Sequence, residues 1–130
     1  MSAGTISRLA LALFAAAGLP PIAAAQPEVA LPSALEAGWK GDRVCALLHE
    51  TETHRVLRCT FPPGVGHERH FHPAHFGYAL SGGRMRITDA NGMRTVEIPT
   101  GSSFSSTGVP WHEGVNVGDT TVAYIMVEEI

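Results

Sequence analysis

The chain has 130 residues, enough for one domain, and leaves no room for separate cofactor and substrate domains. It carries 9 basic and 12 acidic residues, a net charge of −3, which excludes a nucleic-acid binder that needs a basic face. A hydrophobic fraction of 45% is typical of a globular domain and excludes disorder. The unusual feature is histidine, because four of the seven histidines lie between positions 67 and 75.

The first 25 residues have the pattern of a secretory signal peptide. Arg8 precedes an uncharged run over residues 9–19, and Ala23-Ala24-Ala25 offers a small-x-small cleavage site. The apolar run is well short of the roughly 20 residues that span a bilayer, so we expect no membrane span. We therefore predict a leader over residues 1–25, cleavage near Ala25, and an exported protein, either periplasmic or secreted.

Residues 26–42 are rich in proline and alanine and show little periodicity, so we predict an N-terminal arm with one helical turn at residues 33–36. Two cysteines, Cys45 and Cys59, follow in predicted strands. In an oxidising compartment an even number of cysteines allows a disulfide. Two free buried cysteines that pack as small apolar side chains are an equally good interpretation.

Residues 43–130 contain short apolar runs separated by turn residues, with no stretch long enough for an amphipathic helix. The strongest hairpin signal is Asn91-Gly92, since both central positions of a type I′ turn need a positive φ. Strands at this spacing predict one all-β domain, a small barrel or sandwich with a site at an open end. The expected strands are residues 44–49, 54–61, 67–72, 76–80, 85–88, 95–98, 103–105, 111–117 and 121–128.

The histidines are spaced as metal ligands would be. His70 and His72 lie two residues apart in one predicted strand, so their side chains share one face. Pro73 ends that strand, His75 follows the bend, and His112 comes from a remote strand. Imidazoles from these places can converge inside a barrel. Neutral imidazole suits iron, copper, nickel and zinc, so the pattern predicts a metal site.

Two stretches of this sequence carry a resemblance to a known family. The first is Gly64-x5-His70-x-His72, closed by Gly83, and the second runs from Gly101 to Pro110-Trp111-His112-x3-Asn116. Both resemble the motifs of the cupin superfamily, in particular small exported cupins with a single domain. The resemblance implies an antiparallel jelly-roll β-barrel over residues 43–130, commonly a homodimer. It also implies a divalent metal held by the two histidines of the first motif, a glutamate after them, and the histidine of the second motif.

The glutamate position is where this sequence departs from the family pattern. Counting strictly from His72 places it on Phe76, whereas alignment on Tyr78-Ala79-Leu80 places His75 there. We prefer the second alignment, because a slip of the core-facing register costs more than an extra residue in a glycine turn. The prediction is a four-histidine site without a carboxylate ligand, formed by His70, His72, His75 and His112.

Several neighbours are candidates for supporting the site or lining a pocket. By strand alternation, Glu68 lies on the same face as the two histidines of the first motif. His67 lies on the opposite face and is expected at the surface or at the mouth of the barrel. Asn116 lies on the same strand face as the histidine of the second motif, where it either bonds a ligand or holds a loop. Trp111 and Tyr78 are candidates for pocket walls, and a buried Tyr78 hydroxyl would need a partner.

Two classes of function are compatible with these residues. One is a metal-dependent enzyme, such as an oxygenase or isomerase, that acts on a small organic molecule. The other is a non-enzymatic module that binds a small ligand or keeps its metal only for structure. The metal would be one divalent transition ion (Fe, Cu, Ni, Zn or Mn), with Mn the least suited to an all-imidazole site. No catalytic acid or base is assigned from the sequence.

Overall fold

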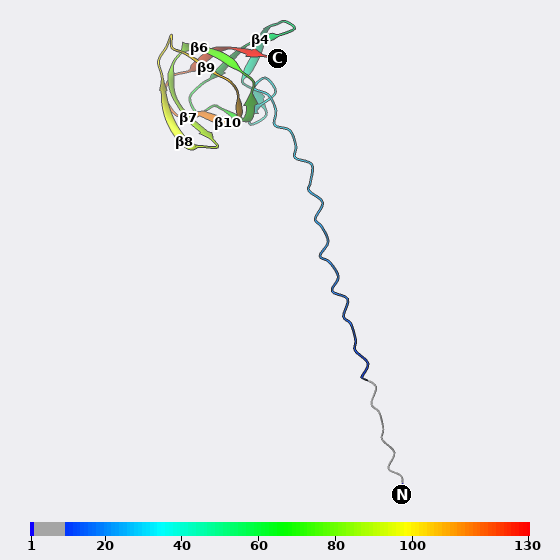
Figure 1. Cartoon of the computed structure of the whole chain (residues 1–130). Helices are drawn as coiled ribbons and strands as arrows, with labels where there is room; N and C mark the ends of the chain where they lie inside the picture. The colour runs from blue at the N-terminus through cyan, green and yellow to red at the C-terminus, as the bar shows by residue number, and fades with distance from the viewer. Residues whose placement is uncertain (2–9) are drawn as a thin grey trace.

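The structure is a computed structural model that describes Met1 and residues 10–130. The beginning of the expected leader, with Arg8 and Leu9, lies outside the described residues. Residues 10–30 are exposed, have no regular secondary structure and extend away from the β domain (Figure 1). Within the described residues, no helix is long and apolar enough to cross a bilayer.

All regular elements in the described part of the chain are β-strands, which confirms the all-β prediction. A two-stranded hairpin of β1 (Gly38–Trp39) and β2 (Asp42–Arg43) comes first. Each of the nine predicted strands is then present. They are β3 (Cys45–Glu50), β4 (His54–Phe61), β5 (Gly66–His72), β6 (His75–Ser81), β7 (Gly83–Asp89), β8 (Gly92–Ile98), β9 (Ser103–Ser106), β10 (Val109–Asn116) and β11 (Val122–Glu129).

The nine strands form two antiparallel sheets, as expected for a jelly roll. The four-stranded sheet has the order β5-β10-β7-β8, and the five-stranded sheet has the order β3-β4-β11-β6-β9. Both sheets therefore pair strands that are distant in the sequence (Figure 1). Strand alternation sends Leu57, Phe61 and Val122 of the five-stranded sheet into a core that they share with Met85 of the four-stranded sheet.

A strap formed by residues 32–40 lies along β5, which is an edge strand of the four-stranded sheet. Within the strap, the Ala37 N–H donates to the Ser33 carbonyl over 2.9 Å, so the predicted single turn is confirmed. The Phe71 N–H of β5 donates to the Pro32 carbonyl over 3.1 Å. The strap thus covers the open edge of the strand that bears three of the histidines.

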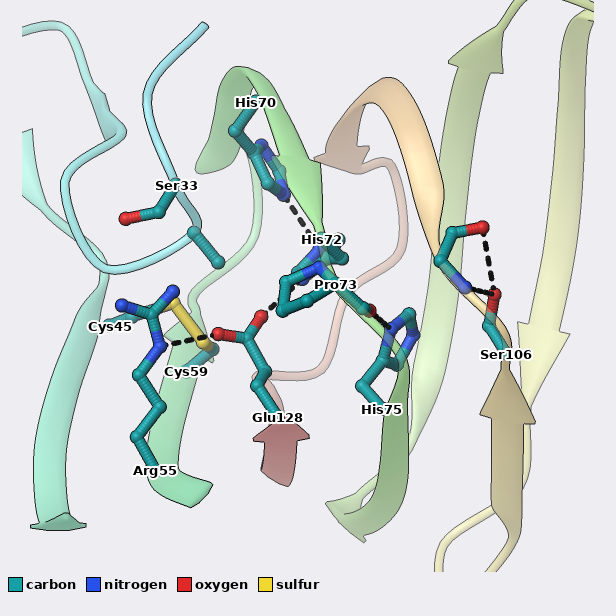
Figure 2. A network of polar contacts seen from close by, with 12 residues as sticks. Ser33, Cys45, Arg55, Cys59, His70, His72, Pro73, His75, Ser106 and Glu128 are labelled. Carbon is teal, nitrogen blue, oxygen red and sulfur yellow. Dashed lines mark hydrogen bonds and ion pairs between the residues drawn. A yellow bond between two sulfur atoms is a disulfide. The ribbon is translucent and has the colours of Figure 1, made fainter. Parts of the chain in front are cut away.

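Cys45 and Cys59 face each other as register partners on β3 and β4, with their Cα atoms 4.0 Å apart. The two sulfur atoms form a disulfide (Figure 2). Of the two interpretations left open by the sequence, the structure therefore has the disulfide, which ties two strands together at the core.

The β7–β8 hairpin forms where it was predicted, but its turn is not type I′. Asp89 pairs with Gly92, so the turn is centred on Ala90 and Asn91. The Asp89 carboxylate accepts the Asn91 N–H over 2.8 Å, a local bond that favours this placement of the turn. Gly92 then takes the positive φ of 110°, which a side chain would disfavour.

Candidate metal centre

The β5–β10 ladder pairs His70 with His112, and irregularities interrupt the ladder on both sides of this pair. The extra residue falls within Glu68–Arg69 on β5 and within Pro110–Trp111 on β10. A bulge reverses the side-chain alternation beyond it and re-aims the residues nearby. Proline fits such a place because it has no N–H to donate to a ladder. The two histidines therefore lie in a segment whose local geometry departs from regular strand.

The bulge on β5 overturns the orientations that parity predicted for His67 and Glu68. The His67 side chain is buried, stacks on His70 with ring centroids 3.7 Å apart, and donates from Nε2 to the Ala34 carbonyl over 2.9 Å. The Glu68 carboxylate is exposed instead and accepts the Lys40 N–H over 2.9 Å. Both expectations assumed a regular strand through this segment, and the extra residue breaks that assumption.

His70, His72 and His112 converge through their Nε2 atoms, and we call these residues the histidine triad. The Nε2 atoms are 2.9 Å apart between His70 and His72, 2.9 Å between His72 and His112, and 3.0 Å between His112 and His70. His70 and His72 project together from β5 (Figure 2), and His112 comes from the adjacent strand β10. The three residues form a group that could hold a metal ion.

The short Nε2 separations cannot all be hydrogen bonds. The Nδ1 atom of His70 lies 2.6 Å from the Glu68 carbonyl, and that of His72 lies 2.6 Å from the Glu128 carboxylate. Both oxygens only accept, so each Nδ1 carries the proton, and in the neutral ring Nε2 then presents a lone pair. Two such lone pairs face each other across 2.9 Å. A cation between them would convert this repulsion into ligation, so the residues fit a metal.

Burial keeps His70 and His112 in the form that binds metals. It lowers the pKa of His70 to about 2, with a further contribution from the neighbouring His67. It lowers the pKa of His112 to about 3, assisted by His72. Neutral imidazole is the ligating form, so these rings need no deprotonation before they bind a metal at neutral pH.

Glu128 lies behind the triad and belongs to the other sheet. Its buried carboxylate accepts from His72 Nδ1 over 2.6 Å and from Arg55 Nε over 2.7 Å (Figure 2). Burial acts to raise the pKa of Glu128, but the hydrogen bonds from His72 and Arg55 outweigh it and hold the pKa below its usual value. Glu128 is therefore a buried anion with two donors.

Glu128 was not predicted from the sequence, although its strand carries a signal. Val122 and Met126 on β11 are buried, and Glu128 continues the same alternation toward the interior. A glutamate in phase with buried apolar residues indicates a buried carboxylate that has partners. Its partner Arg55 carried no such signal, because an arginine near a strand end is most often solvated.

His75, the predicted fourth ligand, lies beside the triad. Its ring centroid is 4.8 Å from that of His72, and its Nδ1 donates to the Pro73 carbonyl over 2.8 Å (Figure 2). Burial lowers the pKa of His75 as well, so this ring is also neutral at pH 7. The structure brings the other three histidines together, and ligation by His75 stays a prediction.

The remaining candidates lie away from the triad or hold the main chain in place. Tyr78 is 43% exposed on the outer side of β6. Trp111 is covered by the Arg69 guanidinium, which lies 3.9 Å from the ring centroid. Asn116 is buried, and its amide donates over 2.8 and 2.7 Å to two main-chain carbonyls, one of them of Thr120. Asn116 therefore holds the chain where β10 ends.

The sequence matches no protein-family model and no curated protein. Solved structures do match. A cupin-domain protein from Bordetella pertussis Tohama I is 19% identical, with a TM-score of 0.63, over 79% of this chain and 99% of that one. A predicted oxalate decarboxylase from Thermotoga maritima is 23% identical over 66% of this chain and 78% of its own, with a TM-score of 0.51. A polyketide cyclase from Streptomyces resistomycificus is 20% identical over 65% and 63%, with a TM-score of 0.54.

These matches define the architecture. The chain has the cupin fold, which confirms the fold that its two motifs implied.

Proposed function

We propose that this protein is a metal-dependent enzyme of the cupin fold. It binds one divalent transition metal on the histidine triad and acts on a small organic molecule, as an oxygenase or an isomerase. The observation that carries the proposal is the spacing of the three Nε2 atoms, which lie 2.9, 2.9 and 3.0 Å apart.

This spacing supports an open metal site over a closed one. Imidazole nitrogens bind first-row metals at about 2.1 Å, so two ligands at right angles lie about 2.9–3.0 Å apart, and two at a tetrahedral angle lie about 3.4 Å apart. The triad spacing is close to the right-angle value, so a bound ion would be held from one side and would have positions left for further ligands, water or substrate. A closed structural zinc site would use four protein ligands in tetrahedral geometry.

Each part of the site would have a distinct role. When bound, the metal would polarise a ligand at an open position as a Lewis acid. The Glu68 carbonyl and the Glu128 carboxylate hold the Nδ1 protons, so that the Nε2 lone pairs of His70 and His72 are free to ligate. His75 donates from Nδ1 and therefore keeps a lone pair on Nε2, and we propose it as an additional ligand.

The reaction is proposed only as a class. Proteins described as a predicted oxalate decarboxylase and as a polyketide cyclase share this fold, so the fold alone does not select a chemistry. Because the triad offers only imidazole nitrogen, iron, copper, nickel and zinc suit it better than manganese.

Metal analysis and a cobalt-loaded sample test the proposal. The purified protein should contain one transition metal per chain by elemental analysis. Replacement with Co²⁺ should give the weak visible absorption of a five- or six-coordinate ion, and added azide should change that spectrum by entering an open position. An intense tetrahedral spectrum that azide leaves unchanged would favour the non-enzymatic module with a structural metal.

We also propose that the protein is exported. The leader pattern of residues 1–25 supports this, and so does the disulfide, since disulfides persist in oxidising compartments. Expression of the full chain in a bacterium should yield a periplasmic or secreted form whose first residue lies near Gln26. A protein retained with its leader in the cytoplasm would contradict export.

The homodimer implied by the family resemblance is likewise a proposal. Light scattering of the purified chain should give twice the mass of one chain, and a mass of one chain would contradict it.

A further inference from the structure

Glu128 and Arg55 connect the two sheets behind the histidine triad. Within the five-stranded sheet, Glu128 on β11 is the direct register partner of Arg55 on β4. The Glu128 carboxylate then reaches across to His72 on the four-stranded sheet. The Glu128 side chain is 0% exposed and that of Arg55 is 14% exposed, so both bonds lie in the interior, where the low dielectric strengthens them.

We propose that Glu128 is a positioning residue for the metal and that Arg55 holds it in that role. This inference rests on the proposed metal site and goes beyond it, because it assigns control of metal affinity to two residues that do not touch the ion. By accepting the Nδ1 proton of His72, Glu128 directs the Nε2 lone pair toward the centre of the triad. The carboxylate charge also makes the imidazole a more basic ligand.

The two neighbours of Glu128 require a carboxylate and not an amide. His72 Nδ1 and Arg55 Nε both donate, and only a group with two accepting oxygens satisfies both. The amide of Glu128→Gln has one accepting oxygen and one donating nitrogen. If the nitrogen faces His72, the imidazole proton must move to Nε2 and block the metal. If the nitrogen faces Arg55, two donors oppose each other in the interior.

The disulfide-bonded strand β4 therefore has a second role beyond the core. Arg55 is fixed by its ladder partner and neutralises the charge of Glu128, which lets a carboxylate stay ionised where water is excluded. Without Arg55, the carboxylate would retain only His72 as a close donor. We expect its hold on His72 to weaken, because no donor then fixes the second oxygen in place.

The first experiment compares Glu128→Gln with a matched control, Glu129→Gln, whose side chain is exposed at the next position. The dissociation constant of Co²⁺ for the folded protein is measured by competition titration at pH 7. We expect about 10–100-fold weaker binding for Glu128→Gln, the range found when partners of metal-bound histidines are removed. Glu129→Gln should bind within about twofold of the unmodified protein, because it leaves both donors of the site in place.

A second comparison separates positioning from general stability. Val122→Ala removes buried apolar contacts at the far end of the same strand, and should lower stability without changing the Co²⁺ spectrum or affinity. Arg55→Met combined with Glu128→Gln removes the opposing donor, so the amide oxygen can turn to His72. We expect this double variant to bind Co²⁺ more tightly than Glu128→Gln alone.

Three results would overturn the inference while the metal site stands. They are unchanged affinity in Glu128→Gln, an equal loss in Val122→Ala, or no recovery in the double variant. If the unmodified protein binds no Co²⁺, Zn²⁺ or Fe²⁺ at all, the proposed function fails instead.

Discussion

The two sheets of this molecule divide the work of the metal site unequally. The four-stranded sheet supplies all three histidines of the triad, from the adjacent strands β5 and β10. The five-stranded sheet supplies none of them. It contributes the disulfide, most of the buried apolar residues, and the Arg55–Glu128 pair.

This division separates the triad from its support, although His75, the proposed additional ligand, comes from β6 of the five-stranded sheet. The spacing of the triad depends on two neighbouring strands and on the bulges beside the His70–His112 pair. The burial of the triad and the Nδ1 hydrogen bond of His72 depend on the opposite sheet, which closes the interior and presents Glu128, whereas His70 bonds the Glu68 carbonyl of its own strand. Changes in the first sheet should therefore remove the metal, and most changes in the second should lower stability or affinity and leave a site in place.

The largest effect is expected on removal of a ligand. His70→Ala or His112→Ala should abolish stoichiometric metal, because the ion then loses one of the three imidazoles that converge on it. Elemental analysis of dialysed protein measures this. His49→Ala serves as the control, since His49 is exposed on β3 and should leave the metal content unchanged. If His112→Ala retains one ion per chain, His112 is not a ligand and the comparison of the sheets loses its basis.

The next effect is on stability and should come from the five-stranded sheet. Leu57 is fully buried in the core, so Leu57→Ala should lower the free energy of unfolding by about 2–5 kcal/mol. The exposed Leu48 of β3 provides a matched change, and Leu48→Ala should cost less than about 0.5 kcal/mol. Urea denaturation gives both values. Loss of metal from folded Leu57→Ala protein would show that the core and the site are not separable.

Removal of the disulfide should have an effect of similar size. The bond closes a loop over a sequence separation of 14 residues, which corresponds to about 3 kcal/mol of stabilisation through restriction of the unfolded chain. The double variant Cys45→Ala and Cys59→Ala should unfold earlier in urea and still bind one metal when folded. An unchanged unfolding midpoint would indicate that the pairing of β3 with β4 needs no covalent support.

The sequence predicted the elements of both sheets better than the contacts between them. Alternation and turn residues located all nine strands of the two larger sheets, and the two motifs indicated the triad, but the short β1–β2 hairpin fell in the predicted arm and was missed. The orientations of His67 and Glu68 were wrong, because a bulge depends on the register of the partner strand, which a single strand does not reveal. The Arg55–Glu128 pair forms because β4 lies beside β11, although the two residues are 73 positions apart in the sequence. Such pairings follow from topology and are not visible in local patterns.

Acid should lower the free energy of unfolding of the metal-free protein, because its buried histidines resist protonation. Burial lowers the pKa of His67 to about 4, and the pKa values of His70 and His112 are lower still. In the unfolded chain these rings take up protons near their usual value of about 6.5, so below that pH the unfolded state binds more protons. The free energy of unfolding should then fall as pH drops from 7 to 5, by about 1 kcal/mol or more per pH unit.

Denaturation of metal-free protein at a series of pH values tests this sign. A His67→Phe variant, which removes one of these groups, should show a shallower dependence on pH. Stability that rises on acidification in this window would mean that the buried histidines are charged in the folded protein, contrary to their surroundings.

The smallest effect is expected for Tyr78, which the sequence made a candidate for a pocket wall. Its side chain is 43% exposed on the outer side of β6, where it pairs in register with Ile125 and Ser103. Removal of its hydroxyl in Tyr78→Phe should change the free energy of unfolding by less than about 0.5 kcal/mol and leave Co²⁺ affinity unaltered. Calorimetric titration measures the affinity. A loss of more than a few-fold would place the hydroxyl at the ion, and the outer face of the five-stranded sheet would then belong to the site rather than to its support.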